Sequence, residues 1–298
     1  MPDVSLSTAD ASEKSRGSQL FKRLRALPIT LYLGVTLISL FVFVVLVSFI
    51  WTPYPANKLN LTNRMAPPGT PGFLLGTDRA GRDVITELML GARNSLYVSV
   101  VSTVVAMFVG TLIGLSIAGS NKMLQRPLTR LVDTGLALPG ILTAMVIAAK
   151  LGAGNTTATI AIIAWQIPVA ARVTIGPARQ ILALDYVEAA YSYGRKKPYV
   201  IRHHVLPNIS PLLIVLGSVM FAAAILIEAA LAFLGVGVQP PTSSWGRFLN
   251  ETQSLLEAAP YLMFFPGIAI VLTTLGFNLL GDGLRTVLDP QQSRSGLA

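Results

Sequence analysis

The segment over residues 29–51 contains no charged residue, and this feature constrains the fold more than any other in the chain. A helix of this length can cross the hydrocarbon core of a bilayer. Trp51 and Tyr54 follow it, as is typical of aromatic residues at a membrane interface. A cleavable signal peptide is the competing interpretation, but its apolar region would be shorter and would end in a small-x-small cleavage site. We therefore expect a first transmembrane helix here.

The rest of the chain is similarly apolar. Hydrophobic residues make up 52% of the 298 residues and charged residues 12%, with a mean hydropathy of +0.62, whereas soluble domains carry about 25% charged residues. Further spans are expected at residues 96–118, 131–149, 158–173, 212–234 and 261–280. Prolines interrupt or border the third and fourth spans, which is tolerated where neighbouring helices or a cavity satisfy the freed backbone groups. The sequence predicts an all-α integral membrane protein with six transmembrane helices.

The regions outside the spans differ from one another. Residues 1–20 are polar without apolar periodicity and are expected to be a disordered N-terminus. Residues 52–94 form a proline-rich external loop that ends in an amphipathic segment. Residues 95–285 hold the other five spans, and residues 286–298 form a tail.

Two local patterns suggest contacts. Arg79 and Asp83 are four residues apart, as in a helical ion pair. Gly110, Gly114 and Gly119 along the second span suit close contact between helices.

The distribution of Lys and Arg predicts the orientation. With six spans, the side of the N-terminus holds 16 of these residues and the other side holds 7, together the 23 in the chain. The positive-inside rule places both termini, and the loop after the fourth span, in the cytoplasm. A net charge of +9 would suggest nucleic-acid binding in a soluble protein. Here most cations lie in short loops beside apolar spans, so the expected partner is the lipid bilayer and no nucleic acid is expected.

Residues 185–207 are the longest polar interruption in the second half and have the pattern of two short helices joined at a glycine. Asp185 and Glu188 have the spacing of a capping box, with Asp185 in the capping position. Gly194 suits the left-handed residue that follows a helix C-terminus. The first helix is therefore expected to stop at Gly194.

The second helix of this hairpin is expected to begin near Pro198, since proline suits a first helical turn. Ile201 and Val205 share one of its faces, and Pro207 is expected to end it. A hairpin with few apolar residues of its own has a shape suited to being bound by another protein. A basic loop lying on lipid headgroups is the alternative.

No pattern of a catalytic or metal site is present. The phosphate-binding motif G-x-x-x-x-G-K-[ST] does not occur, and none of the seven lysines follows a glycine, so this chain is not expected to bind ATP itself. The only two histidines, His203 and His204, are adjacent and would project about 100° apart on a helix, which disfavours a shared metal. The absence of cysteine excludes disulfides and thiolate metal sites. We expect neither an enzyme nor a metalloprotein.

Glu228 lies inside the fifth span. An acidic residue at membrane depth is costly, so by default it faces a partner group or a water-filled path. A proton relay is the alternative, although no His, Asp or Lys accompanies Glu228 at this depth. Its role stays open at this point.

The hairpin also carries a family resemblance. Glu188-Ala189-Ala190, then Gly194 after three further residues, then His204-Val205-Leu206-Pro207 after nine more, resemble the EAA loop of ABC-importer permeases. That pattern has Ile where this chain has His204. His-Val-Leu-Pro-Asn is similar to the dipeptide, oligopeptide and nickel branch in particular.

Other stretches resemble the same branch. LGTDRAGRDV over residues 75–84, followed by GARNSL over residues 91–96, resembles the signature that precedes the second span of C-type dipeptide and oligopeptide permeases. Residues 233–246 resemble the external loop of these permeases, and residues 281–290 resemble their C-terminal end. The resemblance extends from about residue 28 to residue 290.

The resemblance implies a type I ABC-importer permease fold, in which residues 185–207 form a coupling hairpin. Its implied partners are a homologous second permease, two ATPase subunits or domains that bind ATP and Mg, and an external substrate-binding protein. The implied location is a bacterial cytoplasmic membrane. The residues implied at the ATPase contact are Glu188, Ala189, Ala190, Gly194, His204, Leu206 and Pro207.

The implied function is ATP-driven import of dipeptides or oligopeptides. A nickel or other non-peptide importer of the same family stays an alternative, as does, with less support, a stand-alone secondary transporter. The residues that bind the substrate are not identified by any spacing rule.

Overall fold

The computed structural model describes residues 28–56 and 58–288, and its regular elements are helical. The longer elements are α2 (Ile29–Ile50), α3 (Val84–Ala118), α4 (Lys122–Ala137), α5 (Gly140–Leu151), α6 (Asn155–Leu182), α7 (Asp185–Ser192), α9 (Leu206–Phe233), α10 (Trp245–Thr252) and α11 (Tyr261–Leu288). A short helix α8 (Lys197–Val200) and a π-helical turn (Ile201–Val205) precede α9. The expected disordered N-terminus and residues 289–298 of the tail lie outside the described residues.

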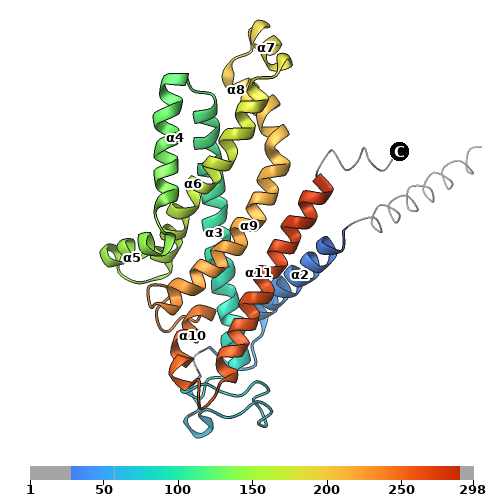
Figure 1. Ribbon diagram of the computed structural model, residues 1–298. Coiled ribbons are helices and arrows are strands. Elements are labelled where there is room, and N and C mark those ends of the chain that lie inside the picture. Colours follow the sequence, from blue (N-terminus) through green and yellow to red (C-terminus); the bar gives the residue numbers. More distant parts are fainter. Residues whose placement is uncertain (1–27, 57, 289–298) are drawn as a thin grey trace, which may run out of the picture.

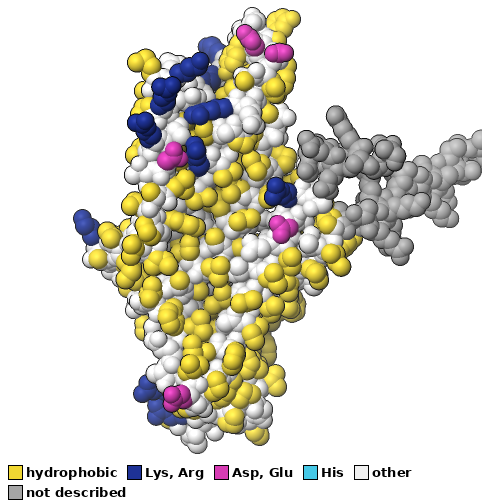
Figure 2. Space-filling model, viewed as in Figure 1, with side chains coloured by type: hydrophobic (Ala, Val, Ile, Leu, Met, Phe, Trp, Pro, Cys, Tyr) yellow, Lys and Arg dark blue, Asp and Glu magenta, His cyan; other side chains and the backbone are white. Residues whose placement is uncertain are grey.

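The long helices run between two ends of the molecule (Figure 1). α3 packs against α6 and α9, and α2 packs against α11. One end carries α7 and α8, and we call it the hairpin end. The opposite end carries α10 and the loop over residues 52–83, and we call it the loop end. On the face in Figure 2, hydrophobic side chains cover the middle, while most Lys and Arg gather toward the two ends.

Glycines allow α3 to approach α6 closely. A Cβ on Gly110 would lie 2.6 Å from the Cβ of Ala170, and a Cβ on Gly114 would lie 2.6 Å from the Cβ of Thr174. The expectation of close helix contact is confirmed at these two positions. Gly119 instead lies against the side chain of Lys197.

α3 begins at Val84, inside the stretch expected to be loop up to residue 94. Asp83 caps it, accepting a hydrogen bond from the backbone N–H of Thr86 at 2.8 Å. The amphipathic segment is therefore the first part of one helix of 35 residues. The expected pairing of Arg79 with Asp83 is wrong, because this carboxylate is used for capping and the ion pair of the loop joins Arg82 to Asp78.

The expected third span over residues 131–149 is not one continuous helix. α4 and α5 meet at an angle of 84°. Leu138 has an extended backbone, with ψ at 124°, because the ring of Pro139 disfavours a helical conformation at the preceding residue. Among the described residues, five helices are long and apolar enough to cross a membrane, or six if the bent pair counts as one span.

The expected fourth and fifth spans are longer than the sequence indicated. α6 continues through Pro168 and Pro177 for 28 residues. The fifth span begins at Lys197 and runs without interruption to Phe233. The first span, α2, agrees with its expected position, whereas the sixth, α11, begins at Tyr261 as expected but continues past residue 280 to Leu288, into the expected tail.

The loop end is held together by ion pairs around Arg82. Its guanidinium lies 2.6 Å from Asp78 and 3.8 Å from Glu87 at the start of α3, and it also pairs with Glu251 on α10. The loop, α3 and α10 are thus joined by one cation. Val84 of α3 and Phe248 of α10 belong to one buried apolar cluster, which lies beside these ion pairs.

Candidate functional site

α7 ends in a Schellman motif centred on Gly194. The N–H of Gly194 donates to the carbonyl of Tyr191 at 2.9 Å, and the N–H of Arg195 donates to the carbonyl of Ala190 at 3.1 Å. Gly194 has a φ of +78°, in the left-handed region, and an added Cβ would meet no atom within 4 Å. The backbone conformation, and not crowding, therefore favours glycine here. The expected end of the first hairpin helix is confirmed.

The N-terminus of α7 differs from the expected capping box. Leu184 occupies the N-cap position and has no side-chain oxygen, so Asp185 lies inside the first turn of the helix. Both Asp185 and Glu188 still interact favourably with the positive end of the helix dipole. The exposed carboxylate of Glu188 makes no ion pair or hydrogen bond within the part of the chain that the structure describes. It is free for a partner.

The inner face of the hairpin is anchored in the helix bundle by apolar side chains. Val187 of α7 and Val200 and Val205 of the second arm are fully buried. They pack with Leu115 of α3 and Ala178 of α6. Ile201 joins the same cluster, which confirms that it shares a face with Val205. A displacement of the hairpin must therefore move residues of the bundle as well.

The second arm of the hairpin does not end at Pro207, so this expectation is wrong. The helix passes through Pro207 into α9, and the N–H of Leu206 donates to the carbonyl of Ile201, a π-type bond. The wider π turn lies immediately before the proline, where an α-helix would be strained by the ring and by the missing N–H. The second arm and the fifth span are consequently one helix, a rigid connection.

The two histidines contact aromatic rings. His203 stacks on Tyr199 with 4.1 Å between ring centroids, and His204 meets Tyr186 of α7 edge-on at 5.7 Å. His204 therefore links the two arms of the hairpin. Within the described residues, no group of three or more His, Cys, Asp or Glu could hold a metal ion.

The outer face of the hairpin combines small, acidic and aromatic residues. Ala189 is exposed, whereas Ala190 is partly buried against the apolar cluster, so the two alanines lie on different sides of the helix. Tyr193 at the tip is 86% exposed. Sequence reasoning missed Tyr193, although exposed tyrosine is enriched at protein interfaces. Leu206 and Pro207 are also exposed, at the base of the second arm.

A second polar site lies inside the bundle, around Glu228 on α9. Its carboxylate accepts hydrogen bonds from Ser95 at 2.9 Å and Asn94 at 3.3 Å, both on α3. The amide of Asn155, at the start of α6, donates to Asn94. Glu228 as a whole is 1% exposed. This network fastens α3, α6 and α9 to one another.

Comparison with known proteins gives a consistent result. Residues 110–294 match the family described as "Binding-protein-dependent transport system inner membrane component". The chain is 36% identical over 257 residues to the glutathione transport system permease protein GsiD of Pectobacterium atrosepticum, covering 85% of each chain. It is 39% identical over 264 residues to the di/tripeptide transport system permease protein DppC of Pseudomonas aeruginosa, covering 87% of each.

A solved structure has a similar fold. It is an inward-facing conformation of the MetNI methionine ABC transporter, with a TM-score of 0.57 and 17% sequence identity. The match covers 68% of this chain and 96% of the other. At this identity the likeness concerns the fold alone, and it agrees with the expected type I permease architecture.

Proposed function

Since the chain belongs to the family of binding-protein-dependent transport system inner membrane components, we propose that it is the permease subunit of an ATP-driven importer of dipeptides or oligopeptides. The observation that carries this proposal is the hairpin of α7, Gly194 and α8. It projects from one end of the bundle with an anchored inner face and a free outer face. The names of the relatives support peptides as the substrate class.

The hairpin is the contact for an ATPase subunit in this proposal. Glu188 and Ala189 form the outer surface of α7, Tyr193 extends it at the C-cap, and the carboxylate of Glu188 is available for a basic residue of the partner. Gly194 holds the turn, while Ala190 and His204 position the two arms from within. Leu206 and Pro207 extend the contact along the second arm. ATP and Mg are bound by the partner subunits.

The continuous helix from Lys197 to Phe233 supports a mechanism for coupling. ATP binding closes the ATPase pair and displaces the hairpin, and the rigid helix carries this displacement to the Glu228 network at the other end of α9. The helices then repack from an inward-facing to an outward-facing state, a shift between two existing conformations. This chain and a second, homologous permease together form the outward-facing state. An external binding protein delivers the substrate to it.

The orientation follows from the same proposal. An ATPase contact must lie in the cytoplasm, so the hairpin end is cytoplasmic and the loop end is external. The excess of Lys and Arg expected on the cytoplasmic side supports this orientation, and it puts both termini in the cytoplasm of a bacterial inner membrane.

Co-purification tests the proposal. The chain, tagged at its C-terminus, is isolated from its own membrane in mild detergent, and its partners are identified. A complex with a second permease and P-loop ATPases is expected, and once reconstituted with its binding protein it is expected to import dipeptides only with ATP. Recovery of the chain alone, or transport without ATP, would overturn the importer assignment. ATP-dependent uptake of Ni²⁺ but not of peptides would overturn the substrate class alone.

A further inference from the structure

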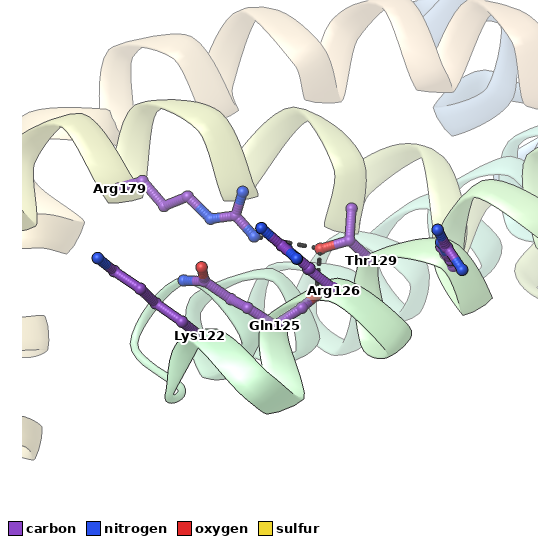
Figure 3. Close-up of a pocket in the computed structure, with 6 residues that line it drawn as sticks. Lys122, Gln125, Arg126, Thr129 and Arg179 are labelled. Carbon is purple, nitrogen blue, oxygen red and sulfur yellow. Dashed lines mark hydrogen bonds between the residues drawn. The ribbon is translucent and has the colours of Figure 1, made fainter.

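A groove between α4 and α6, at the hairpin end, has no part in the mechanism proposed above. Its volume is about 530 Å³. The side chains that line it are Lys122, Gln125, Arg126, Thr129, Arg130 and Arg179 (Figure 3). Four of these six are cations, and none is acidic. The groove therefore has the composition of an anion site.

The cations of α4 form one stripe. Lys122, Arg126 and Arg130 are spaced four residues apart, so they share one side of the helix. Like charges at this spacing repel, which destabilises the helix unless an anion compensates. Arg179, in the last turn of α6, lies across the groove from them. Within residues 28–56 and 58–288, the five ion pairs involve other cations.

Arg179 is oriented before any ligand arrives. Its Nη2 donates to the hydroxyl of Thr129 at 3.1 Å, and that hydroxyl donates to the carbonyl of Gln125 at 2.7 Å. The Nε–H of Arg179 is buried and has no hydrogen-bond partner among the described residues. A buried N–H without a partner is unfavourable, so the guanidinium of Arg179 has hydrogen-bonding capacity that the described residues leave unused.

The start of α4 adds to the positive potential. The N-cap, Asn121, makes no side-chain capping bond. The partial positive charge of the helix N-terminus therefore lies uncompensated beside Lys122 and Arg126. An anion at this end of the groove would interact with both cations and with the helix dipole.

Apolar side chains lie next to the cationic stripe. The exposed large hydrophobic side chains of α4 are Met123, Leu124, Leu128, Leu131 and Leu136, and Met123 is 90% exposed. A ligand that fits both surfaces carries a phosphate and hydrocarbon chains. We propose that the groove binds an anionic phospholipid, with its phosphate against Arg126, Arg130 and Arg179 and its acyl chains along the apolar side chains.

Basic pockets between helices on the cytoplasmic side of a membrane are suited to anionic headgroups. The assignment of the groove to the cytoplasmic leaflet depends on the orientation proposed above. The assignment of a phosphate to the cations of the groove does not depend on that orientation. The site would make the arrangement of α4 and α6, and so of the neighbouring hairpin, dependent on the lipid composition. Lys197 of the hairpin lies against Gly119, just before α4, which provides the connection.

Retention of lipid by the purified complex tests the proposal. The full transporter complex is reconstituted in nanodiscs of phosphatidylcholine with increasing phosphatidylglycerol, and the lipid retained after extraction into detergent is counted by native mass spectrometry. The test variant is Arg126→Gln with Arg130→Gln, both at exposed positions that do not carry the fold. The matched control is Arg285→Gln, an exposed arginine at the end of α11 outside the groove.

The wild-type complex and Arg285→Gln are expected to retain phosphatidylglycerol in preference to phosphatidylcholine. The double variant is expected to bind it about 25-fold more weakly, about fivefold for each cation removed. Binding of millimolar inorganic phosphate by the wild-type complex, without preferential retention of phosphatidylglycerol, would support the phosphate site but overturn the lipid as its occupant. Equal retention by the double variant and the wild type would overturn the proposal. The proposal would also be overturned if the double variant lost the second permease or the ATPase while retaining as much lipid as the wild type. The groove would then be a protein interface.

Discussion

Glu228 on α9 accepts a hydrogen bond from the hydroxyl of Ser95 on α3, with 2.9 Å between the two oxygens. The second donor, Asn94, lies one residue earlier on the same helix. Both of these donors are neutral, as is a third side-chain partner, Ser244 at the start of α10, and no ion pair involves Glu228 within the described residues. This pairing explains an acidic residue at membrane depth as a link between two spans. It argues against a proton relay, which needs a second titratable group within reach.

Replacing Glu228 therefore tests whether its role is structural. Glu228→Ala is expected to lower the free energy of unfolding by about 2–4 kcal/mol, because it opens a cavity and leaves the donors of Ser95 and Asn94 unsatisfied. Glu228→Gln keeps the shape and one acceptor oxygen, so its expected cost is about 1 kcal/mol. Thermal unfolding of the purified complex measures both, with Glu257→Gln at an exposed position as control.

ATP-driven uptake separates the structural role from the relay. The structural role predicts that Glu228→Gln transports at close to the wild-type rate. A variant with wild-type thermal stability and no uptake would instead require a carboxylate that changes its protonation state.

The geometry of Gly194 leads to a second prediction. A β-branched residue in the left-handed region costs about 1–2 kcal/mol, which changes a conformational equilibrium by a factor of about 5–30. Gly194→Val is therefore expected to reduce ATP-driven uptake by about that factor, whereas Gly194→Asn, which tolerates this conformation, should reduce it less. Gly194→Asp is expected to abolish uptake, since its charge would also have to lose water at the proposed ATPase contact.

A matched glycine controls for backbone strain. Gly69, in the loop of the opposite end, has a φ of +85° and no atom within 4 Å of an added Cβ. Gly69→Val should strain the backbone as Gly194→Val does while leaving uptake unchanged. Similar loss of uptake in both variants, at equal amounts of inserted protein, would show that strain alone is responsible and that Gly194 has no special part in coupling.

The expectations that succeeded depended on properties of single segments. A charge-free run of bilayer length becomes a helix wherever it lies, and α2 covers Ile29–Ile50 as its composition indicated. Gly194 could be assigned from the sequence because glycine is the residue that most readily takes a positive φ at the end of a helix. These features need no knowledge of the rest of the chain.

The expectations that failed depended on neighbours or on exact geometry. The bend at Pro139 lies inside a stretch whose mean hydropathy suits a span. Mean hydropathy over a stretch gives no information about the backbone conformation at a single residue. Pro207 is tolerated in a helix because a π turn precedes it, and burial of Val205 against the bundle holds that turn in place. The partners of Glu228 come from residues more than 130 positions away, so no local pattern could identify them.

Close packing of α3 on α6 gives a third prediction. Gly114→Val would place atoms within 2.7 Å of the carbonyl oxygen of Ala171, a backbone atom that cannot move away easily. The expected cost is about 1–3 kcal/mol, measured by thermal unfolding in detergent. Gly176→Val on α6 is the control, because an added Cβ there has no neighbour within 4 Å. Equal stability of the two variants would mean that the helices are not in contact at Gly114.

Arg82 gives the last prediction. Burial lowers its pKa, but the carboxylates of Glu87, Asp78 and Glu251 more than offset this effect, so the pKa is raised and the side chain stays charged. Arg82→Gln would leave three carboxylates at the loop end without their common cation. Loss of one partner of a buried ion pair costs about 3–5 kcal/mol, and the lower part of this range is expected because Arg82 is 15% exposed.

The loop over residues 52–83 should then separate from α10, since Arg82 is the cation that joins Asp78 to Glu251. Limited proteolysis measures this separation, and cleavage in the loop is expected to accelerate in Arg82→Gln but not in Arg79→Gln, which removes an exposed charge three residues earlier. Unchanged cleavage in Arg82→Gln would mean that apolar packing around Val84 and Phe248 holds the loop by itself. The polar residues of the LGTDRAGRDV stretch would then be available for a contact outside this chain.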